Sequence, residues 1–180
     1  MVVLFLADGF EEIEALLPLD LLRRAGVQTV TVGLGGREIR GAHGITVLAD
    51  TDRVPEGDVD MVILPGGMPG AANLDASGMV ANTLARASAR GAHLAAICAA
   101  PMVLGHKGYL VGKRAVCFPG FENELTGAEV QTDKGVVRDG NVITAKGMGV
   151  ALEFGLTLVA ALKDEQTARA LRRAVMAPEV

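Results

Sequence analysis

A thiol at Cys98 and a carboxyl at Glu14 are the two side chains of this sequence best placed to do chemistry. Cys98 follows a short apolar run over residues 92–97 and precedes Pro101, which suits the first turn of a helix. The thiol is therefore expected between a buried strand and a helix, where open α/β sheets bind ligands. The free N–H groups and dipole of that helix favour a thiolate, so we predict a reactive cysteine of low pKa. The alternative is a small buried hydrophobe in an alanine-rich segment.

Glu14 lies on the inward stripe of a helix predicted over residues 10–25. Phe10, Glu14, Leu17 and Leu21 recur at spacings of four, three and four, which places them on one helical face. A carboxyl on the inner face is a candidate general acid or base. A stripe that drifts around the helix would instead leave Glu14 at the solvent edge, as is usual for glutamate.

Two glycine-rich turns follow predicted strands, and they differ in what they indicate. Residues 33–36 lead into charged residues instead of a helix, so they form a turn and not a dinucleotide-binding fingerprint. Residues 65–70 follow the buried strand predicted over 59–64, and closely spaced backbone amides there can form an anion-binding nest. By itself this second loop is weak support for a site.

The elements that must position these groups alternate between strand and helix, which favours a sheet buried under helices on both faces. The predicted core strands are 2–7, 27–33, 59–64, 92–97 and 141–145, with a short strand at 45–48. The predicted helices are 10–25, 77–90, one beginning near Pro101, 149–162, and one capped by Asp164. Between them, residues 114–141 read as short strands and turns, with a hairpin at 135–140.

Length and composition limit the function classes. With 180 residues, half of them hydrophobic, we expect one domain over residues 1–180. The net charge of −4 and the lack of a basic block argue against specific nucleic-acid binding. The apolar residues 1–6 are too short and lack a basic leader, so neither a signal peptide nor a membrane span is expected. We therefore predict a soluble cytoplasmic protein that does not associate with membranes and whose two cysteines are free thiols.

Taken together, four motifs of this chain resemble the ThiJ/PfpI superfamily, in the branch that contains the Parkinson-disease-associated protein deglycase and its bacterial relatives. The motifs span nearly the whole chain in the family's order, and their combination is specific although each alone is not. They are residues 7–14 (ADGFEEIE), 64–67 (LPGG), 95–101 (AAICAAP), and 144–149 (TAKGMG) before a helix with Glu153 and Phe154. The resemblance implies an α/β fold of the flavodoxin-like type: a three-layer sandwich with a mostly parallel central sheet and a nucleophile elbow.

The resemblance also assigns roles to particular residues. Cys98 matches the elbow nucleophile, which the family usually holds in a strained backbone conformation, and Glu14 matches the glutamate that contacts it. The backbone amides of Gly67 and Ala99 match the oxyanion-hole donors, and Gly66 is expected beside them. No cofactor is implied, and no His, Cys, Asp or Glu residues have metal-ligand spacing.

Three positions bear on how far the resemblance extends. Phe118 stands where many relatives have a histidine, so a Cys–His dyad within one subunit is not expected; Phe118 and Cys117 are candidates to line the cleft. Ala99 stands where the protease branch has a histidine, which disfavours proteolysis. His43 lies where the disease-associated protein has an arginine that reaches the partner subunit's site, so a contribution across a homodimer is open.

The resemblance implies an enzyme of reactive dicarbonyls that acts on a small aldehyde or on a glycated thiol or amine. It would be a glutathione-independent glyoxalase that converts methylglyoxal to lactate, or a protein or nucleotide deglycase. The alternative is a redox-sensing or chaperone-like stress protein that uses oxidation of Cys98. A third hypothesis, a non-catalytic flavodoxin-like binding module, requires an inert Cys98. The family also implies a homodimer, with the first helix and residues 43–47 as the candidate interface.

Overall fold

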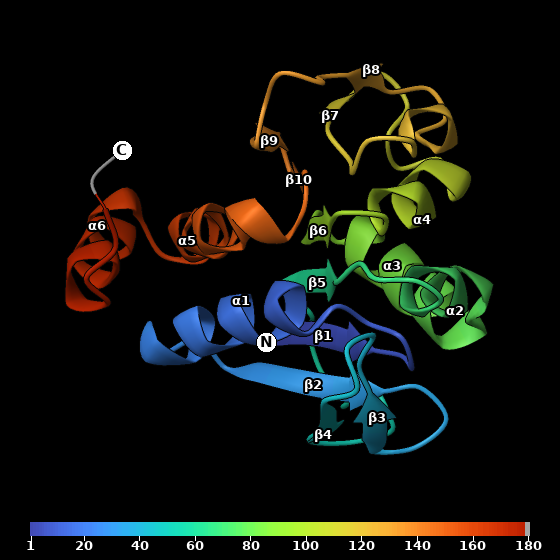
Figure 1. Ribbon diagram of the computed structural model, residues 1–180, viewed down its shortest axis with the longest axis horizontal. Coiled ribbons are helices and arrows are strands. Elements are labelled where there is room, and N and C mark those ends of the chain that lie inside the picture. The colour runs from blue at the N-terminus through green and yellow to red at the C-terminus, as the bar shows by residue number, and fades with distance from the viewer. Residues whose placement is uncertain (179–180) are drawn as a thin grey trace.

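A six-stranded sheet forms the centre of the protein, which a computed structural model describes over residues 1–178 (Figure 1). The last two residues of the predicted domain, 179 and 180, lie outside the described residues. In spatial order the strands are β2 (Thr29–Gly33), β1 (Val2–Leu6), β5 (Met61–Leu64), β6 (His93–Ile97), β10 (Val142–Ala145) and β9 (Val136–Asp139). All neighbours are parallel except β9 and β10, which form an antiparallel hairpin. The hairpin predicted over 135–140 is therefore one strand of a longer hairpin, whose second strand is the predicted core strand at 141–145.

The sheet is buried on both faces because its central strands are almost entirely apolar. Every residue of β1, β5 and β10 is buried, as expected of parallel strands covered by helices on both sides. Two small two-stranded sheets lie outside it. They pair β3 (Glu38–Arg40) with β4 (Thr46–Leu48), and β7 (Arg114–Ala115) with β8 (Glu129–Val130).

Helices cover both faces of the sheet and complete three layers (Figure 1). On one face lie α1 (Glu12–Arg24) and α5 (Ala151–Leu162), which contact each other, with α6 (Glu165–Ala174) beyond α5. On the other lie α2 (Gly70–Ala76), α3 (Gly78–Ala89) and α4 (Pro101–His106). Short 3₁₀ turns occur at η1 (Glu122–Glu124) and η2 (Met148–Val150). The predicted α/β fold with a mostly parallel central sheet is confirmed.

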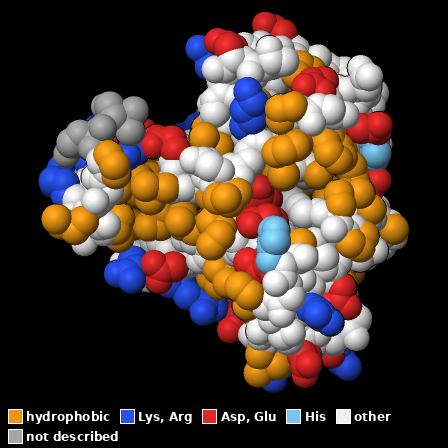
Figure 2. Space-filling model, viewed as in Figure 1, with side chains coloured by type: hydrophobic (Ala, Val, Ile, Leu, Met, Phe, Trp, Pro, Cys, Tyr) orange, Lys and Arg blue, Asp and Glu red, His pale blue; other side chains and the backbone are white. Residues whose placement is uncertain are grey.

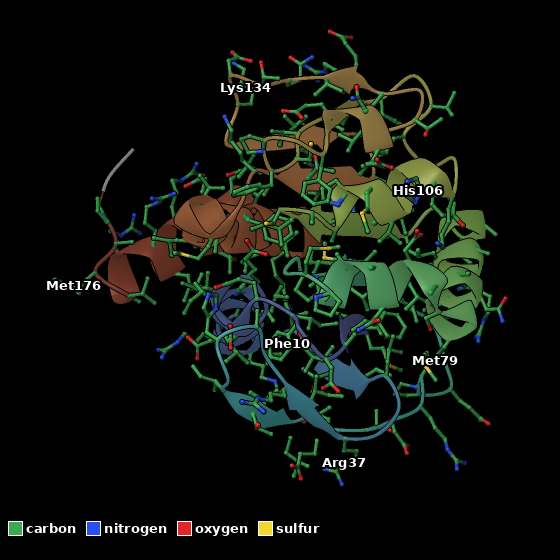
Figure 3. All side chains as sticks on the ribbon, turned by 45° about the vertical axis from the view of Figure 1, so that its right-hand side comes forward. Phe10, Arg37, Met79, His106, Lys134 and Met176 are labelled. Atoms are coloured by element: carbon green, nitrogen blue, oxygen red, sulfur yellow. The ribbon has the colours of Figure 1, made fainter. Side chains whose placement is uncertain are left out.

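The topology brings four loops together at one edge of the sheet. Since β1, β5, β6 and β10 run parallel, the segments after their carboxyl ends meet there: residues 7–11, 65–69, 98–100 and 146–147. Phe10, labelled in Figure 3, is fully buried and anchors the first of these loops beneath α1. In the described part of the chain, no helix has the length and apolar character that crossing a membrane requires.

Candidate active site

Cys98 occupies a sharp turn between β6 and α4 and has a left-handed backbone conformation, with φ of +65°. Such a conformation costs a non-glycine residue about 1–3 kcal/mol, so the surroundings must hold it. Its N–H donates to the Ala145 carbonyl at 2.9 Å, and its own carbonyl accepts from the Phe118 N–H at 2.8 Å. These two bonds fix the residue between β10 and the 116–119 loop. The half-buried side chain is a free thiol.

Glu14 reaches Cys98 from the first turn of α1 and is 1% exposed, so its predicted inward position is confirmed. Of the rest of the predicted stripe, Leu21 is buried, Leu17 is half-buried and Phe10 precedes the helix. Its Oε2 accepts the Gly66 N–H at 3.0 Å, and the carboxyl is hydrogen-bonded to the Cys98 thiol and to the Met148 N–H. Glu11 caps the helix by accepting the Glu14 N–H at 2.7 Å, which fixes the turn that carries Glu14. The carboxyl therefore has a defined position against the sulfur.

The two acidic groups have strongly perturbed pKa values because they are buried together. Burial raises the pKa of Glu14 to about 7. Burial, together with the charge of the Glu14 carboxylate and its hydrogen bond, raises the pKa of the Cys98 thiol to about 12. The low thiol pKa predicted from the helix amino end is therefore wrong, because desolvation and the like charge outweigh the backbone amides.

The Gly66–Gly67 turn closes the other side of the sulfur. The backbone N–H groups of Gly67 and Ala99 both hydrogen-bond to Cys98 and lower its pKa. A Cβ on Gly66 would lie 2.5 Å from the Cβ of Cys98 and 2.6 Å from Glu14 Oε2, so only glycine fits between the two groups. At Gly67, φ is +84° and a Cβ would lie 2.5 Å from the backbone nitrogen of Glu11. Glycine is thus required at both positions for the amides to approach the thiol.

The two candidate lining residues after β7 have different environments. Phe118 is 48% exposed and lies beside the site, since a Cβ on Gly147 would be 3.3 Å from the Phe118 ring and 3.9 Å from Glu14 Oε1. Cys117 is only 3% exposed and packs in the hydrophobic core beneath α4, so it does not line the cleft. Val116 and Cys117 are both buried, and the chain turns outward only at Phe118.

His43 lies near the start of α1, where it pairs with Glu12 of its own chain. Its Nδ1 is 2.9 Å from Glu12 Oε2 and 4.0 Å from Glu11 Oε1. The hydrogen bond to Glu12 raises the pKa of His43. Burial raises the pKa of Glu12, but hydrogen bonds from His43 and Ile45 outweigh it and lower that pKa overall. A role for His43 in a partner's site stays a prediction.

Glu11, Glu12 and His43 also form the group of side chains whose donor atoms could reach one cation, since these atoms lie within 4.8 Å of one another. Metal-ligand spacing in the sequence did not reveal this group, because His43 is 31 residues from Glu12 and arrives through the β3–β4 hairpin. Glu12 Oε1 is already occupied by the backbone N–H groups of His43 and Ile45. The hydrogen bond between His43 and Glu12 already gives the buried carboxylate a partner.

Residues 1–161 of the chain match the model of the DJ-1/PfpI family. The chain is 35% identical over 172 residues to the Parkinson disease protein 7 homolog of Danio rerio, covering 92% of this chain and 91% of that protein. It is 31% identical over 172 residues to the glutathione-independent glyoxalase DJR-1.2 of Caenorhabditis elegans, covering 94% and 91%. The crystal structure of Drosophila melanogaster DJ-1beta aligns with a TM-score of 0.94 at 34% identity, covering 99% of this chain and 98% of that one.

Proposed function

This chain belongs to the DJ-1/PfpI family, and we propose that it is a cysteine-dependent enzyme that acts on reactive dicarbonyls. The observation that carries the proposal is the buried Glu14 carboxyl hydrogen-bonded to the Cys98 thiol, with the Gly67 and Ala99 amides on the same sulfur. A C. elegans relative named a glutathione-independent glyoxalase supports it. The reaction is conversion of methylglyoxal to lactate, or the related removal of early glycation adducts from thiols and amines of proteins or nucleotides.

The first step is addition of the Cys98 thiolate to the aldehyde carbon of an α-oxoaldehyde, which gives a hemithioacetal. The oxygen that gains charge lies near the N–H groups of Gly67 and Ala99, which stabilise it. Glu14, with a pKa of about 7, holds a proton in a large fraction of molecules at neutral pH and delivers it to this oxygen. Proton delivery leaves Glu14 as a carboxylate beside a neutral thioether sulfur.

In the second step the Glu14 carboxylate takes the acidified proton from the hemithioacetal carbon and returns it to the neighbouring carbon through an enediol. This internal transfer oxidises the first carbon to a thioester and reduces the second to an alcohol, so no external oxidant or cofactor is needed. Water then cleaves the thioester to release a 2-hydroxy acid and the free thiol. One thiol and one carboxyl therefore suffice.

Turnover should be slow, because Phe118 replaces a residue that could act as a second acid or base. Loss of a positioned acid or base typically costs about 10²- to 10⁴-fold in rate. The only histidine near the start of α1, His43, is paired with Glu12 in this chain. The remaining pair must therefore carry every proton transfer.

The test is steady-state formation of lactate from methylglyoxal in H₂O and in D₂O. We expect many equivalents of lactate per chain, with partial retention or exchange of the transferred proton, and a loss of at least about 10²-fold in Cys98→Ser. Cys117→Ala is the matched control, because it removes the buried thiol that does not reach the cleft. Stoichiometric capture of one methylglyoxal per Cys98 with no lactate would contradict the proposal.

That outcome would favour the second candidate, a redox-sensing stress protein. The same Glu14 carboxyl and backbone amides that contact the sulfur could stabilise the oxygens of a Cys98 sulfinate. The two candidates separate by turnover, since a sensor consumes its thiol once and an enzyme regenerates it. We place either activity in the cytoplasm on the basis of the sequence.

A further inference from the structure

An apolar groove lies beside the Cys98 site, between two loops of the same sheet edge. Its volume is about 370 Å³, and its walls come from the 116–119 loop and the 146–150 loop. Phe118 and Pro119 form one wall, while Gly147, Met148 and Val150 form the other. Phe118 is 48% exposed and Met148 is 53% exposed, so two large apolar side chains face solvent beside a polar catalytic pair. Exposed apolar side chains gathered in a concave surface indicate a binding site.

Two residues that line the groove also lie against the site. Gly147 lies between the Phe118 ring and Glu14 Oε1, and the Phe118 N–H donates to the carbonyl of Cys98. The sole charged lining residue is Lys146, whose Nζ donates to the Thr132 carbonyl at 2.8 Å. The groove therefore offers apolar walls and no carboxylate or free guanidinium to an occupant.

In the proposed reaction, the geometry of the site limits where the rest of the substrate can lie. The aldehyde oxygen faces the amides of Gly67 and Ala99, and Glu14 occupies another side of the sulfur. The Gly66 side is closed, because even a single added carbon there would collide with Cys98. The remaining substituent of the substrate therefore extends toward Phe118 and Met148.

We propose that this groove binds the apolar substituent of the substrate, so that the chain acts preferentially on α-oxoaldehydes that carry an aryl or bulky alkyl group. The inference rests on the proposed function, and it makes Phe118 a specificity-determining residue. An added methylene in an apolar pocket changes specificity by about 10-fold or more, so a phenyl group should be favoured over a methyl group by at least that factor.

The experiment compares kcat/KM for phenylglyoxal and methylglyoxal in the wild type, Phe118→Ala and Phe118→His. The ratio between the two substrates should fall about tenfold in both variants. Comparing ratios between variants cancels the difference in intrinsic reactivity of the two aldehydes. Val111→Ala is the matched control, because Val111 is 66% exposed and lies outside the groove, and its ratio should not change.

A second arm of the experiment measures alkylation of Cys98 and does not depend on catalytic turnover. The alkylation rate of Cys98 by N-benzyl iodoacetamide relative to iodoacetamide, followed by mass spectrometry, should also fall in Phe118→Ala and stay constant in Val111→Ala. Absence of turnover with both aldehydes in the wild type would remove the proposed function, while this arm still tests the groove. Unchanged ratios in both arms would overturn the inference. A changed sedimentation coefficient in Phe118→Ala with unchanged ratios would instead assign the groove to a second copy of the chain.

Discussion

The chemistry of the site depends on one proton shared between Cys98 and Glu14. Burial raises the pKa values of both groups, and the Glu14 carboxylate raises that of the Cys98 thiol further, so the two are not ionised together near neutral pH. In the proposed reaction the attacking form is a thiolate beside a protonated carboxyl. It carries a single proton and is the less populated arrangement of that proton, because Glu14 is the stronger acid. Both the pH dependence and the effect of neutralising Glu14 follow from this pairing.

The pH profile of kcat/KM should rise through about 7. Below that pH the pair holds two protons, a thiol and an acid, and no thiolate is present. As pH rises through the Glu14 pKa of about 7, one proton leaves and the reactive single-proton form appears. Rates should then hold until the second proton leaves, toward about 12. Steady-state kinetics from pH about 5 to about 9 measures this limb; a rate that declines through neutrality would contradict it.

Glu14→Gln should change alkylation and turnover in opposite directions. The substitution removes the carboxylate charge that raises the thiol pKa, so iodoacetamide should label Cys98 faster, by about tenfold near pH 8. Turnover should fall by about 10²- to 10⁴-fold, because an amide does not exchange protons. Glu38→Gln, at an exposed carboxylate on β3, is the control and should alter neither rate.

In wild type, labelling should select Cys98 over Cys117. Both thiols have raised pKa values, about 12 and about 11, so acidity alone would not favour Cys98. Accessibility decides the outcome, because Cys117 is 3% exposed and sits in the core. Mass spectrometry of partly alkylated protein gives both rates. Equal or faster labelling of Cys117 in folded protein would show that the cleft reaches it.

At the residue scale, the sequence predicted which way a side chain faces better than it predicted the protonation state of that side chain. The spacing of Phe10, Glu14 and Leu21 correctly placed the carboxyl inside, since periodicity reports which way a side chain faces. The spacing of residues could not reveal the pKa of the Cys98 thiol, because the desolvation of the thiol depends on atoms that come from four separate loops. Nor did it separate Cys117 from Phe118, because no clear alternation marks that short segment.

At the element scale, the glycine turn after β5 brings α1 and the Cys98 elbow together. Gly66 donates its N–H to Glu14, and its carbonyl accepts the Glu11 N–H at 2.9 Å. The turn therefore holds the start of α1 through both backbone polar groups of one residue, Gly66. Its contribution depends on the absence of a side chain at Gly66.

Gly66→Ala should damage both the site and the fold. The added carbon would lie 2.5 Å from the Cys98 Cβ, so the turn must move away from the thiol. Overpacking of this kind costs about 1–3 kcal/mol of stability, and kcat should fall with it. Gly78→Ala is the control, because a Cβ on that first residue of α3 would meet nothing within 4 Å. Chemical denaturation measures the stability of both variants, and steady-state kinetics measures their kcat. Full activity in Gly66→Ala would contradict the close packing of Gly66 against Cys98.

The long elements were predictable and the short ones were not. Apolar runs identified β1, β5 and β6 to within two residues at each end, because buried parallel strands lack polar interruptions. The short elements that were missed include α2, which follows directly on the glycine turn, and β3, whose residues Glu38–Arg40 were interpreted as the exit of a turn. Such segments depend on tertiary contacts, here the pairing of β3 with β4.

At the scale of the whole molecule, hydrophobic side chains gather over the face that carries α1 and α5, as Figure 2 shows. Ile13 on α1 is 43% exposed, and Ile45 and Leu48 in the β3–β4 hairpin region are 55% and 68% exposed. Ile13 lies in the helix and Ile45 in the segment 43–47 that the family resemblance suggests as a homodimer interface, and Leu48 lies next to that segment. His43 lies in the same segment, so an assembly through it would decide whether His43 reaches a second site.

We expect this chain to form a homodimer through α1 and residues 43–47. A stable interface buries about 800 Å² per partner, and exposed Ile13 and Ile45 would supply its apolar centre. Ile13→Lys combined with Ile45→Asp should therefore shift sedimentation velocity at micromolar concentration from dimer to monomer, since each change buries a charge. Val111→Asp, at an exposed position away from α1, should stay dimeric. If the wild type sediments as a monomer, the dimer is excluded, and His43 can act only through the Glu12 of its own chain.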